Sequence, residues 1–292
     1  MISGFISLIR YWLPAAVDQE SLAPKLARFY AERSDYHEMT ANDNKLGYPQ
    51  VRLLLETISA TDRVVEFGCG GGVVLQAAGK LAAEALGFDI GDIAIEKANS
   101  RPGQHRAIKA DAAHVPLPSN YADIVYSFEV LEHVWDPAAV IREMIRVAKP
   151  GGLVYFTTPN GFAMNLHLQL RKAVRLIHHV GAAVNLLLAE LRAEPYQNIP
   201  PDLDASPVYP DCDMITRLHP RSLEAFARKS GCPATRLETL FFLRADSQSD
   251  TERRRYEQLE NHPFYHWHGD HIFFQGIKSG DPGGRASVSD AG

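Results

Sequence analysis

Short apolar runs alternate with longer amphipathic stretches through the middle of the chain. The apolar runs predict strands at about 63–67, 85–89, 106–110, 122–127 and 153–158. Apolar residues at helical spacing predict helices at about 73–83, from about 92 onward, and at about 137–148. Runs of this length suit strands that are buried on both faces of a sheet. The alternation therefore predicts a doubly wound α/β fold with a mostly parallel sheet.

The flanking regions follow a different pattern. They predict two or three helices within 20–58, a long amphipathic helix at 164–193, a proline-rich connector at 195–210, a helix at 220–230, and strands at 236–243 and 271–278. The chain then divides into an N-terminal helical segment (1–44), a core (45–160), a helical cap insertion (161–215), the remainder of the core (216–278) and a disordered tail (279–292). Prolines would hold the insertion as a cap rather than as a free linker.

The composition of the chain indicates which class of protein it belongs to and which partners are disfavoured. Of the 292 residues, 46% are hydrophobic and 22% are charged, which is typical of a soluble globular protein. The net charge of −5 disfavours a nucleic-acid partner. The three cysteines show neither metal-type spacing nor a disulfide framework, so a cytoplasmic location is expected. Residues 1–13 predict an amphipathic helix that packs on the domain or in a homodimer, with contact to a membrane surface as the alternative.

A glycine-rich stretch directly after the first strand carries the strongest chemical signal. Gly68, Gly70 and Gly72 separate that strand from the next helix, as in ligand-binding strand–turn–helix units. A dinucleotide fingerprint would need its third glycine at position 73, where this chain has Val73. The spacing therefore disfavours a pyrophosphate ligand.

Two acids near this stretch indicate another ligand. Glu66, two residues before Gly68, is awkward for a pyrophosphate but suits a cationic ligand with an amino group. Asp89 ends the second strand 21 residues after Gly68, where an acid that binds ribose is expected. A nucleoside site without a phosphate site points to S-adenosylmethionine.

Four motifs, in order, resemble those of the class I S-adenosylmethionine-dependent methyltransferases, and most closely the small-molecule branch called methyltransferase type 11. They are residues 66–72, 110–112, 128–134 and 149–152. The resemblance covers about 45–160. It implies a Rossmann-like sheet of seven strands with an antiparallel hairpin at its edge. It also implies an enzyme that methylates a small-molecule acceptor, at oxygen in preference to nitrogen or carbon.

The resemblance assigns cofactor contacts to residues at the strand ends. These residues are Glu66, Gly68, Cys69, Gly70, Gly72, Asp89, Ile90, Asp111, Ala112, Phe128 and Glu129. Glu66 would lie near the amino group, Asp89 would bind the ribose hydroxyls and Ile90 would flank the adenine. Asp111 and Ala112 would meet the adenine edge, while Phe128 and Glu129 would close the methionine side.

Histidines are the candidates for chemistry on the acceptor. His133 follows the fourth strand and titrates near neutral pH, so it can act as a general base; a structural or orienting role is the alternative. A second group comprises His262, His266, His268 and His271. A metal site is not expected there, because no dense acidic cluster accompanies these rings. We expect one or two of them to reach the acceptor pocket.

Other interpretations stay open. Tyr30, Tyr36, His37 and Tyr48 precede the first strand and either line the ligand pocket or pack as ordinary aromatics. A methyltransferase-like binding module without activity is one alternative function, which the intact glycine loop and both acids disfavour. A nicotinamide-dependent dehydrogenase is another, which Val73 disfavours.

Overall fold

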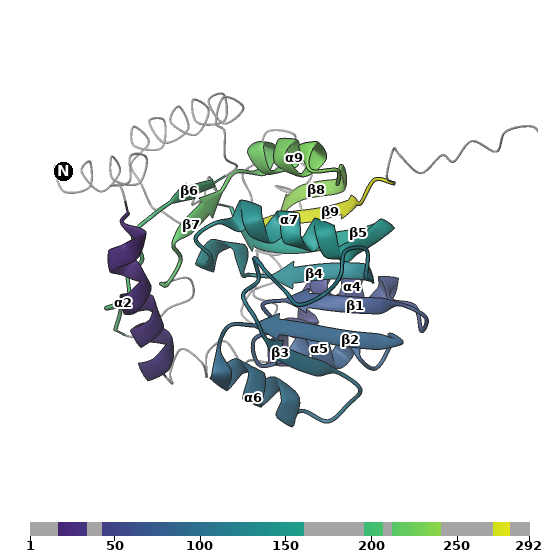
Figure 1. Cartoon of the computed structure of the whole chain (residues 1–292), viewed down its shortest axis with the longest axis horizontal. Coiled ribbons are helices and arrows are strands. Elements are labelled where there is room, and N and C mark those ends of the chain that lie inside the picture. Colours follow the sequence, from purple (N-terminus) through teal and green to yellow (C-terminus); the bar gives the residue numbers. More distant parts are fainter. Residues whose placement is uncertain (1–16, 34–42, 161–195, 207–211, 241–270, 281–292) are drawn as a thin grey trace, which may run out of the picture.

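The computed structural model describes residues 17–33, 43–160, 196–206, 212–240 and 271–280 (Figure 1). Several predicted features lie outside the described residues. They are the helices at 1–13 and 164–193, Tyr36, His37, the three histidines 262, 266 and 268, and the tail beyond residue 280.

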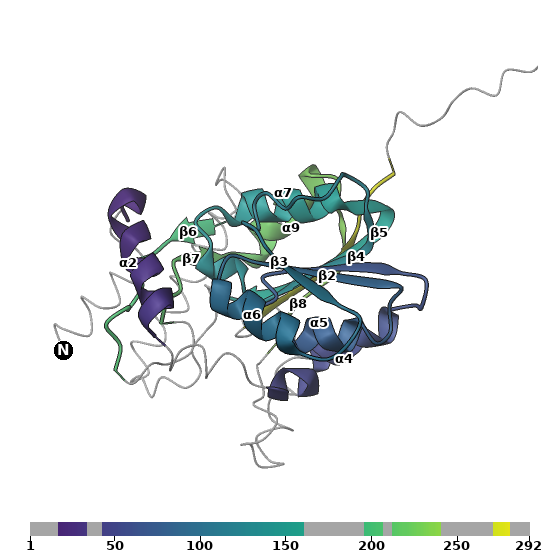
Figure 2. The same cartoon turned by 60° about the horizontal axis from the view of Figure 1, so that its bottom comes forward.

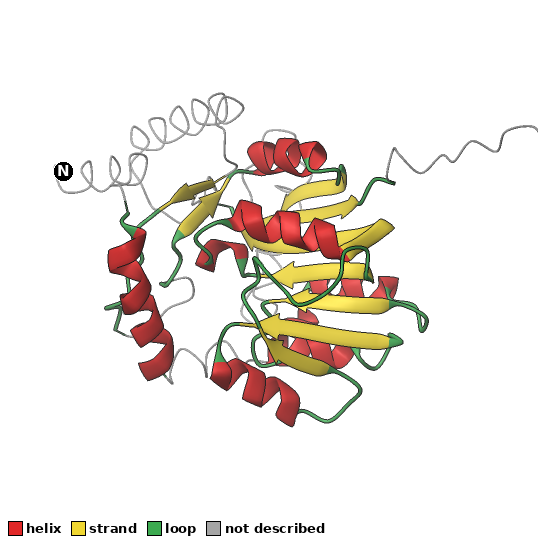
Figure 3. Cartoon of the chain, in the orientation of Figure 1, coloured by secondary structure: helices red, strands yellow, loops and turns green. Residues whose placement is uncertain are grey.

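A seven-stranded sheet organises the described residues, in the order β3-β2-β1-β4-β5-β9-β8. Its strands are β1 (Arg63–Phe67), β2 (Glu84–Asp89), β3 (Arg106–Lys109), β4 (Ala122–Phe128), β5 (Ala148–Pro159), β8 (Ala234–Leu240) and β9 (His271–Ile277). The first five strands are parallel, and β9 runs antiparallel to both β5 and β8. The predicted mostly parallel sheet with an antiparallel edge hairpin is confirmed (Figure 3).

Helices cover both faces of this sheet. The described helices are α2 (Gln19–Glu32), η1 (Asp43–Gly47), α4 (Pro49–Thr57), α5 (Val73–Ala78), α6 (Asp92–Ser100), η2 (Leu131–His133), α7 (Pro137–Val147) and α9 (Pro220–Lys229). Figure 2 shows α7 and α9 on one face and α4 and α5 on the other. Within the described ranges, no helix combines the length and the apolar character that crossing a membrane requires.

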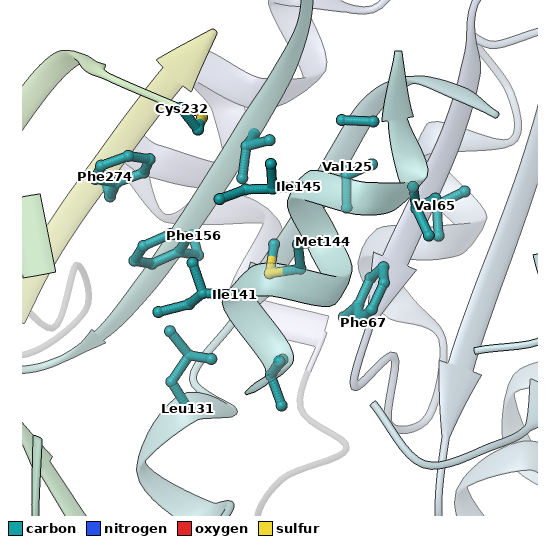
Figure 4. Close-up of a cluster of buried hydrophobic side chains, with 14 of the residues drawn as sticks. Val65, Phe67, Val125, Leu131, Ile141, Met144, Ile145, Phe156, Cys232 and Phe274 are labelled. Atoms are coloured by element: carbon teal, nitrogen blue, oxygen red, sulfur yellow. The ribbon is translucent and has the colours of Figure 1, made fainter. Parts of the chain in front are cut away.

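Each face of the sheet has its own hydrophobic core, because successive strand residues point to opposite faces. On the α7 face, Phe67 and Phe156 belong to the same buried cluster as Met144 (Figure 4). On the opposite face, Tyr126 shares a cluster with Leu54 of α4. With both faces covered, a ligand can reach the sheet only at the strand ends.

Two predicted boundaries were wrong. The helix predicted to end at residue 83 ends at Ala78, where the loop before β3 crosses closely: a Cβ on Gly79 would lie 2.8 Å from the Gln104 carbonyl oxygen. The strand predicted to begin at residue 153 begins at Ala148, because Ala148 already pairs with Ala122 of β4.

A second, two-stranded sheet was not predicted. β6 (Tyr196–Asn198) and β7 (Thr216–Leu218) pair antiparallel, so the expected connector over 195–210 begins as a strand. The Thr216 hydroxyl donates to the Val134 carbonyl oxygen at 2.7 Å, and this hydrogen bond holds β7 next to the end of η2. The pair and α2 both lie beyond the carboxyl ends of the parallel strands (Figure 1).

Candidate functional site

The glycine-rich turn lies at the carboxyl end of β1 and leads into α5. Gly68, Gly70 and Gly72 have φ angles of 70°, 50° and 75°, in the left-handed region that favours glycine. A Cβ on Gly68 would lie 2.2 Å from Cγ2 of Val130, and one on Gly72 would lie 2.7 Å from Cβ of Ala98. At Gly70, by contrast, no heavy atom of the described residues comes within 4 Å of that position. Gly70 therefore faces open space that a ligand can fill.

The end of β2 holds this turn in place. The Asp89 carboxylate accepts hydrogen bonds from the Gly70 amide at 2.8 Å and the Gly91 amide at 2.9 Å. The Phe88 carbonyl oxygen accepts one from the Gly68 amide at 2.7 Å. The acid predicted to bind ribose is thus also a structural part of the glycine turn.

Replacing Asp89 with alanine is expected to weaken S-adenosylmethionine binding by about 1–3 kcal/mol. The ribose hydroxyls would lose a charged acceptor, and the amides of Gly70 and Gly91 would lose theirs. Isothermal titration calorimetry on the folded variant measures the change. Asp92→Ala, which removes an exposed carboxylate paired with Lys109, is the control and should bind normally. Unchanged affinity in Asp89→Ala would remove this residue from the site.

Glu66 is a buried acid next to the turn, with only 3% of its surface exposed. The Tyr126 hydroxyl donates to its Oε2 at 3.2 Å, and the backbone of Leu75 in α5 also bonds its side chain. Burial raises the pKa of Glu66 to about 8, against the opposing effect of the Lys45 charge. A cationic amino group placed beside this carboxyl would favour its charged form.

The raised pKa of Glu66 predicts a pH-dependent stability. Folded Glu66 keeps its proton up to about pH 8, whereas an unfolded glutamate loses it near pH 4.3, about its ordinary pKa. The folded state therefore holds the extra proton between these values. The contribution of this proton to the free energy of unfolding is complete below about pH 4. Above that pH it decreases by about 1.4 kcal/mol per pH unit, and it is lost once the pH has risen through the folded pKa.

Urea unfolding of the wild type and Glu66→Gln at pH 6 and pH 8 measures this dependence. From the lower to the higher pH, the wild type should lose about 2 kcal/mol of unfolding free energy relative to the variant. The glutamine variant serves as the reference because it keeps every other titrating group. A difference between the two proteins that stays constant with pH would contradict the prediction.

The adenine-side residues lie at the ends of β2 and β3. Ile90 follows β2 with 67% of its surface exposed, so an apolar side chain stands in solvent where a flat ring could cover it. Asp111 is exposed after β3, where its Oδ1 accepts a hydrogen bond from the Ala113 amide at 2.8 Å. Both positions are compatible with the expected contacts.

Three predicted residues turn their side chains mainly toward the core. Cys69 and Phe128 are buried, and Ala112 packs partly against the α7-side cluster. The Phe128 ring contacts the rings of Tyr126 and Tyr155. At Cys69 and Phe128, the backbone is therefore the part that can meet a ligand.

Glu129 directly follows β4 and has a φ of 54°, which is uncommon for a residue other than glycine. Its carboxylate accepts a hydrogen bond from the Thr157 hydroxyl at 2.5 Å and lies 3.2 Å from Nε2 of His271. Burial raises the pKa of Glu129, but the His271 charge and these hydrogen bonds outweigh it and hold the pKa below its ordinary value. His271, one of the four histidines singled out in the sequence, thus reaches the end of β4.

His133 lies one helical turn after Val130, a residue that contacts the glycine loop. Its turn begins at Val130, whose carbonyl oxygen accepts from the His133 amide at 2.9 Å and whose side chain packs against Gly68. The ring lies between two fully buried carboxylates. Nδ1 is 3.1 Å from Oδ2 of Asp213, and Nε2 is 3.5 Å from Oε1 of Glu132.

Sequence reasoning missed most of the groups around His133. The Tyr30 hydroxyl donates to Asp213 at 2.8 Å, and the Thr158 hydroxyl donates to Glu132 at 2.9 Å. Tyr30 was one of the aromatics expected to line a pocket or to pack, and it joins this cluster. Tyr48 packs against the α4-side core instead. Across the described part of the chain, no three His, Cys, Asp or Glu side chains are arranged to hold a metal ion.

The features at the strand ends together fit S-adenosylmethionine. Gly70 leaves open space beside the turn, Asp89 offers a carboxylate, and Ile90 offers an exposed apolar surface. Glu66 adds a buried acid that a cationic amino group would favour in its charged form.

Comparison with known proteins gives the same assignment. Residues 65–156 match the family model described as a methyltransferase domain. A ubiquinone biosynthesis O-methyltransferase of Methylococcus capsulatus is 38% identical over 110 residues, which are 36% of this chain and 46% of that protein. One from Bordetella pertussis is 34% identical over 157 residues, which are 49% of this chain and 62% of that protein. The chain thus spans less than two thirds of either relative.

Solved structures show the same fold. The crystal structure of an S-adenosylmethionine-dependent methyltransferase from Mesorhizobium loti has a TM-score of 0.56 and 18% sequence identity, covering 81% of this chain and 98% of that one. Fold, motifs and family model agree. Residues 65–156 are therefore a methyltransferase domain, and the fold is the one seen in this S-adenosylmethionine-dependent methyltransferase.

Proposed function

We propose that the protein transfers the methyl group of S-adenosylmethionine to a hydroxyl group of a small-molecule acceptor. One observation carries this proposal: the turn that bears His133 packs through Val130 against Gly68 of the glycine loop. A group able to take a proton is thereby held beside the turn that binds the methyl donor. The names of the two O-methyltransferase relatives support oxygen as the accepting atom.

In this proposal the glycine turn, Glu66, Asp89 and Ile90 hold the cofactor. When bound, S-adenosylmethionine supplies a methyl group already activated by its sulfonium. The residues that hold the donor contribute by placing it, and placement is worth about 7–11 kcal/mol of barrier in favourable cases. Glu129, fixed by Thr157 and His271, closes the methionine side.

His133 is the general base of the proposed reaction. Its side chain is 18% exposed, so the ring is largely enclosed while part of it remains accessible to an acceptor. Taking the proton from a hydroxyl as it becomes an ether would contribute about 10²–10⁴-fold to the rate.

The acceptor is a small molecule rather than a nucleic acid, and the net charge of −5 supports this choice. The cysteines Cys69, Cys212 and Cys232 are buried thiols that form no disulfide, which suits a reducing compartment such as the cytoplasm. The amphipathic pattern of residues 1–13 leaves a homodimer, or contact with a membrane surface, as further partners in this proposal.

Calorimetry paired with a turnover screen tests the proposal. S-adenosylmethionine and S-adenosylhomocysteine should both bind the full chain. Turnover should then appear with at least one class among phenolic rings, sugars and lipid-linked precursors. Binding of both ligands without turnover on any acceptor would favour a methyltransferase-like binding module. Absence of binding would refute the assignment of the cofactor.

A further inference from the structure

The two ring nitrogens of His133 have different surroundings. Nδ1 lies 3.1 Å from the Asp213 carboxylate, within ion-pair distance, whereas Nε2 lies 3.5 Å from Glu132. An unprotonated Nδ1 would place its lone pair against the negative carboxylate at this distance, so the shorter contact favours a proton on Nδ1. In the neutral ring this leaves Nε2 as the nitrogen that can take a proton.

One hydrogen bond holds the Asp213 carboxylate, and another holds the backbone that follows it. The Tyr30 hydroxyl donates to the same oxygen, Oδ2, that faces His133, at 2.8 Å. Burial raises the pKa of Tyr30 well above its ordinary value, and the charge of Asp213 raises it further, so this hydroxyl keeps its proton. The flanking backbone is fixed as well, because the Ile215 amide donates to the Glu132 carbonyl oxygen at 2.9 Å.

These contacts come from parts of the chain outside the segment that matches the family model, residues 65–156. Tyr30 belongs to α2, and Asp213 lies near the end of the predicted insertion (161–215). Phe29 of α2 packs in one small cluster with Ala205 and Cys212, and Arg33 donates to the Ala205 carbonyl oxygen at 3.1 Å. Helix α2 and the chain around Asp213 therefore form one body, which contacts His133 through the Asp213 carboxylate.

We propose that Asp213 is the positioning residue of His133, and that Tyr30 holds Asp213 in place; this rests on the proposed role of His133 as general base. Asp213 keeps the proton of the neutral ring on Nδ1, so that Nε2 is the nitrogen left to take a proton from the acceptor. Nε2 takes the proton of the acceptor O–H group as the oxygen electron pair bonds to the methyl carbon of the sulfonium donor. The carbon–sulfur bond breaks with its electron pair on sulfur, and the imidazolium later returns its proton to water.

The tautomer of His133 tests this directly and needs no acceptor. Nitrogen-15 NMR of the histidine-labelled full chain, with S-adenosylhomocysteine added, distinguishes a proton on Nδ1 from one on Nε2. His133→Gln identifies the signals. The wild type should carry the proton on Nδ1 when the ring is neutral. Asp213→Ala should lower the ratio of the Nδ1–H to the Nε2–H form about tenfold or more.

Two further variants make the result decisive. Tyr30→Phe removes only the hydroxyl and should lower the same ratio about two- to fivefold, which keeps the test available if Asp213→Ala fails to fold. Asp204→Ala removes an exposed carboxylate from the same segment and should leave the ratio unchanged. Calorimetry with S-adenosylhomocysteine confirms that each variant is folded.

A proton on Nε2 in the wild type, or an unchanged ratio in folded Asp213→Ala and Tyr30→Phe, would overturn the positioning role. Failure of the proposed function has a different signature. If His133→Gln keeps full methyl transfer while the ratio responds to Asp213→Ala, then His133 is not the base, and the contact with Asp213 is structural only.

Discussion

Replacing Gly68 with alanine is expected to lower the free energy of unfolding by about 2–5 kcal/mol. The φ of 70° at this position costs a residue with a Cβ about 1–2 kcal/mol. The new methyl group would also lie 2.2 Å from Cγ2 of Val130, and overpacking of this kind costs about 1–3 kcal/mol. Val130 begins the turn that carries His133, so relief of the clash would displace that turn. Urea unfolding followed by circular dichroism measures the loss.

Gly70→Ala is the matched control for this prediction. It introduces the same methyl group at a similar φ of 50°, but no described heavy atom lies within 4 Å of the new carbon. We expect about 1–2 kcal/mol of lost stability and a larger loss of S-adenosylmethionine affinity, because the methyl group enters the ligand space. Equal destabilisation of the two variants would show that contact with Val130 does not constrain Gly68.

His133→Gln is expected to lower kcat by about 10²–10⁴-fold while leaving the affinity for S-adenosylmethionine nearly unchanged. Glutamine keeps polarity and approximate size but cannot take a proton at neutral pH. The pH profile of kcat should also lose the ionisation that a general base contributes. Stopped-assay kinetics on the acceptor found in the turnover screen, together with calorimetry, separate the two effects.

His114→Gln is the control for that variant. His114 is exposed in the loop after β3, so its loss should change neither kcat nor cofactor affinity. Wild-type turnover in His133→Gln would show that His133 is structural. A parallel loss of cofactor affinity would show that the ring supports the glycine turn rather than the acceptor.

The sheet and the residues at its strand ends could be predicted because their signals are local. Each core strand is a short apolar run, and the glycine turn directly follows one of them. Asp89 and Asp111 are placed by the ends of their own strands, so spacing from Gly68 is enough to find them. Val73, in place of a third glycine, disfavours a dinucleotide site at this turn.

The surroundings of His133 could not be predicted because their contacts join distant segments. Tyr30 and Asp213 are separated by 183 residues along the chain and share a hydrogen bond. Nothing near Asp213 distinguishes it in sequence from an ordinary loop acid. The strands β6 and β7 have three residues each, too few for a periodic signal, and they form only through pairing with each other.

The place of β9 has a consequence for synthesis of the protein. This strand lies between β5 and β8 although it follows both in the sequence, and its first residue, His271, is the partner of Glu129 (Figure 1). A chain still emerging from the ribosome can form β1 to β5 and the glycine turn, but not the contact that fixes Glu129. Nascent chains should thus form the glycine turn well before Glu129 is fixed, which delays turnover until β9 has been inserted.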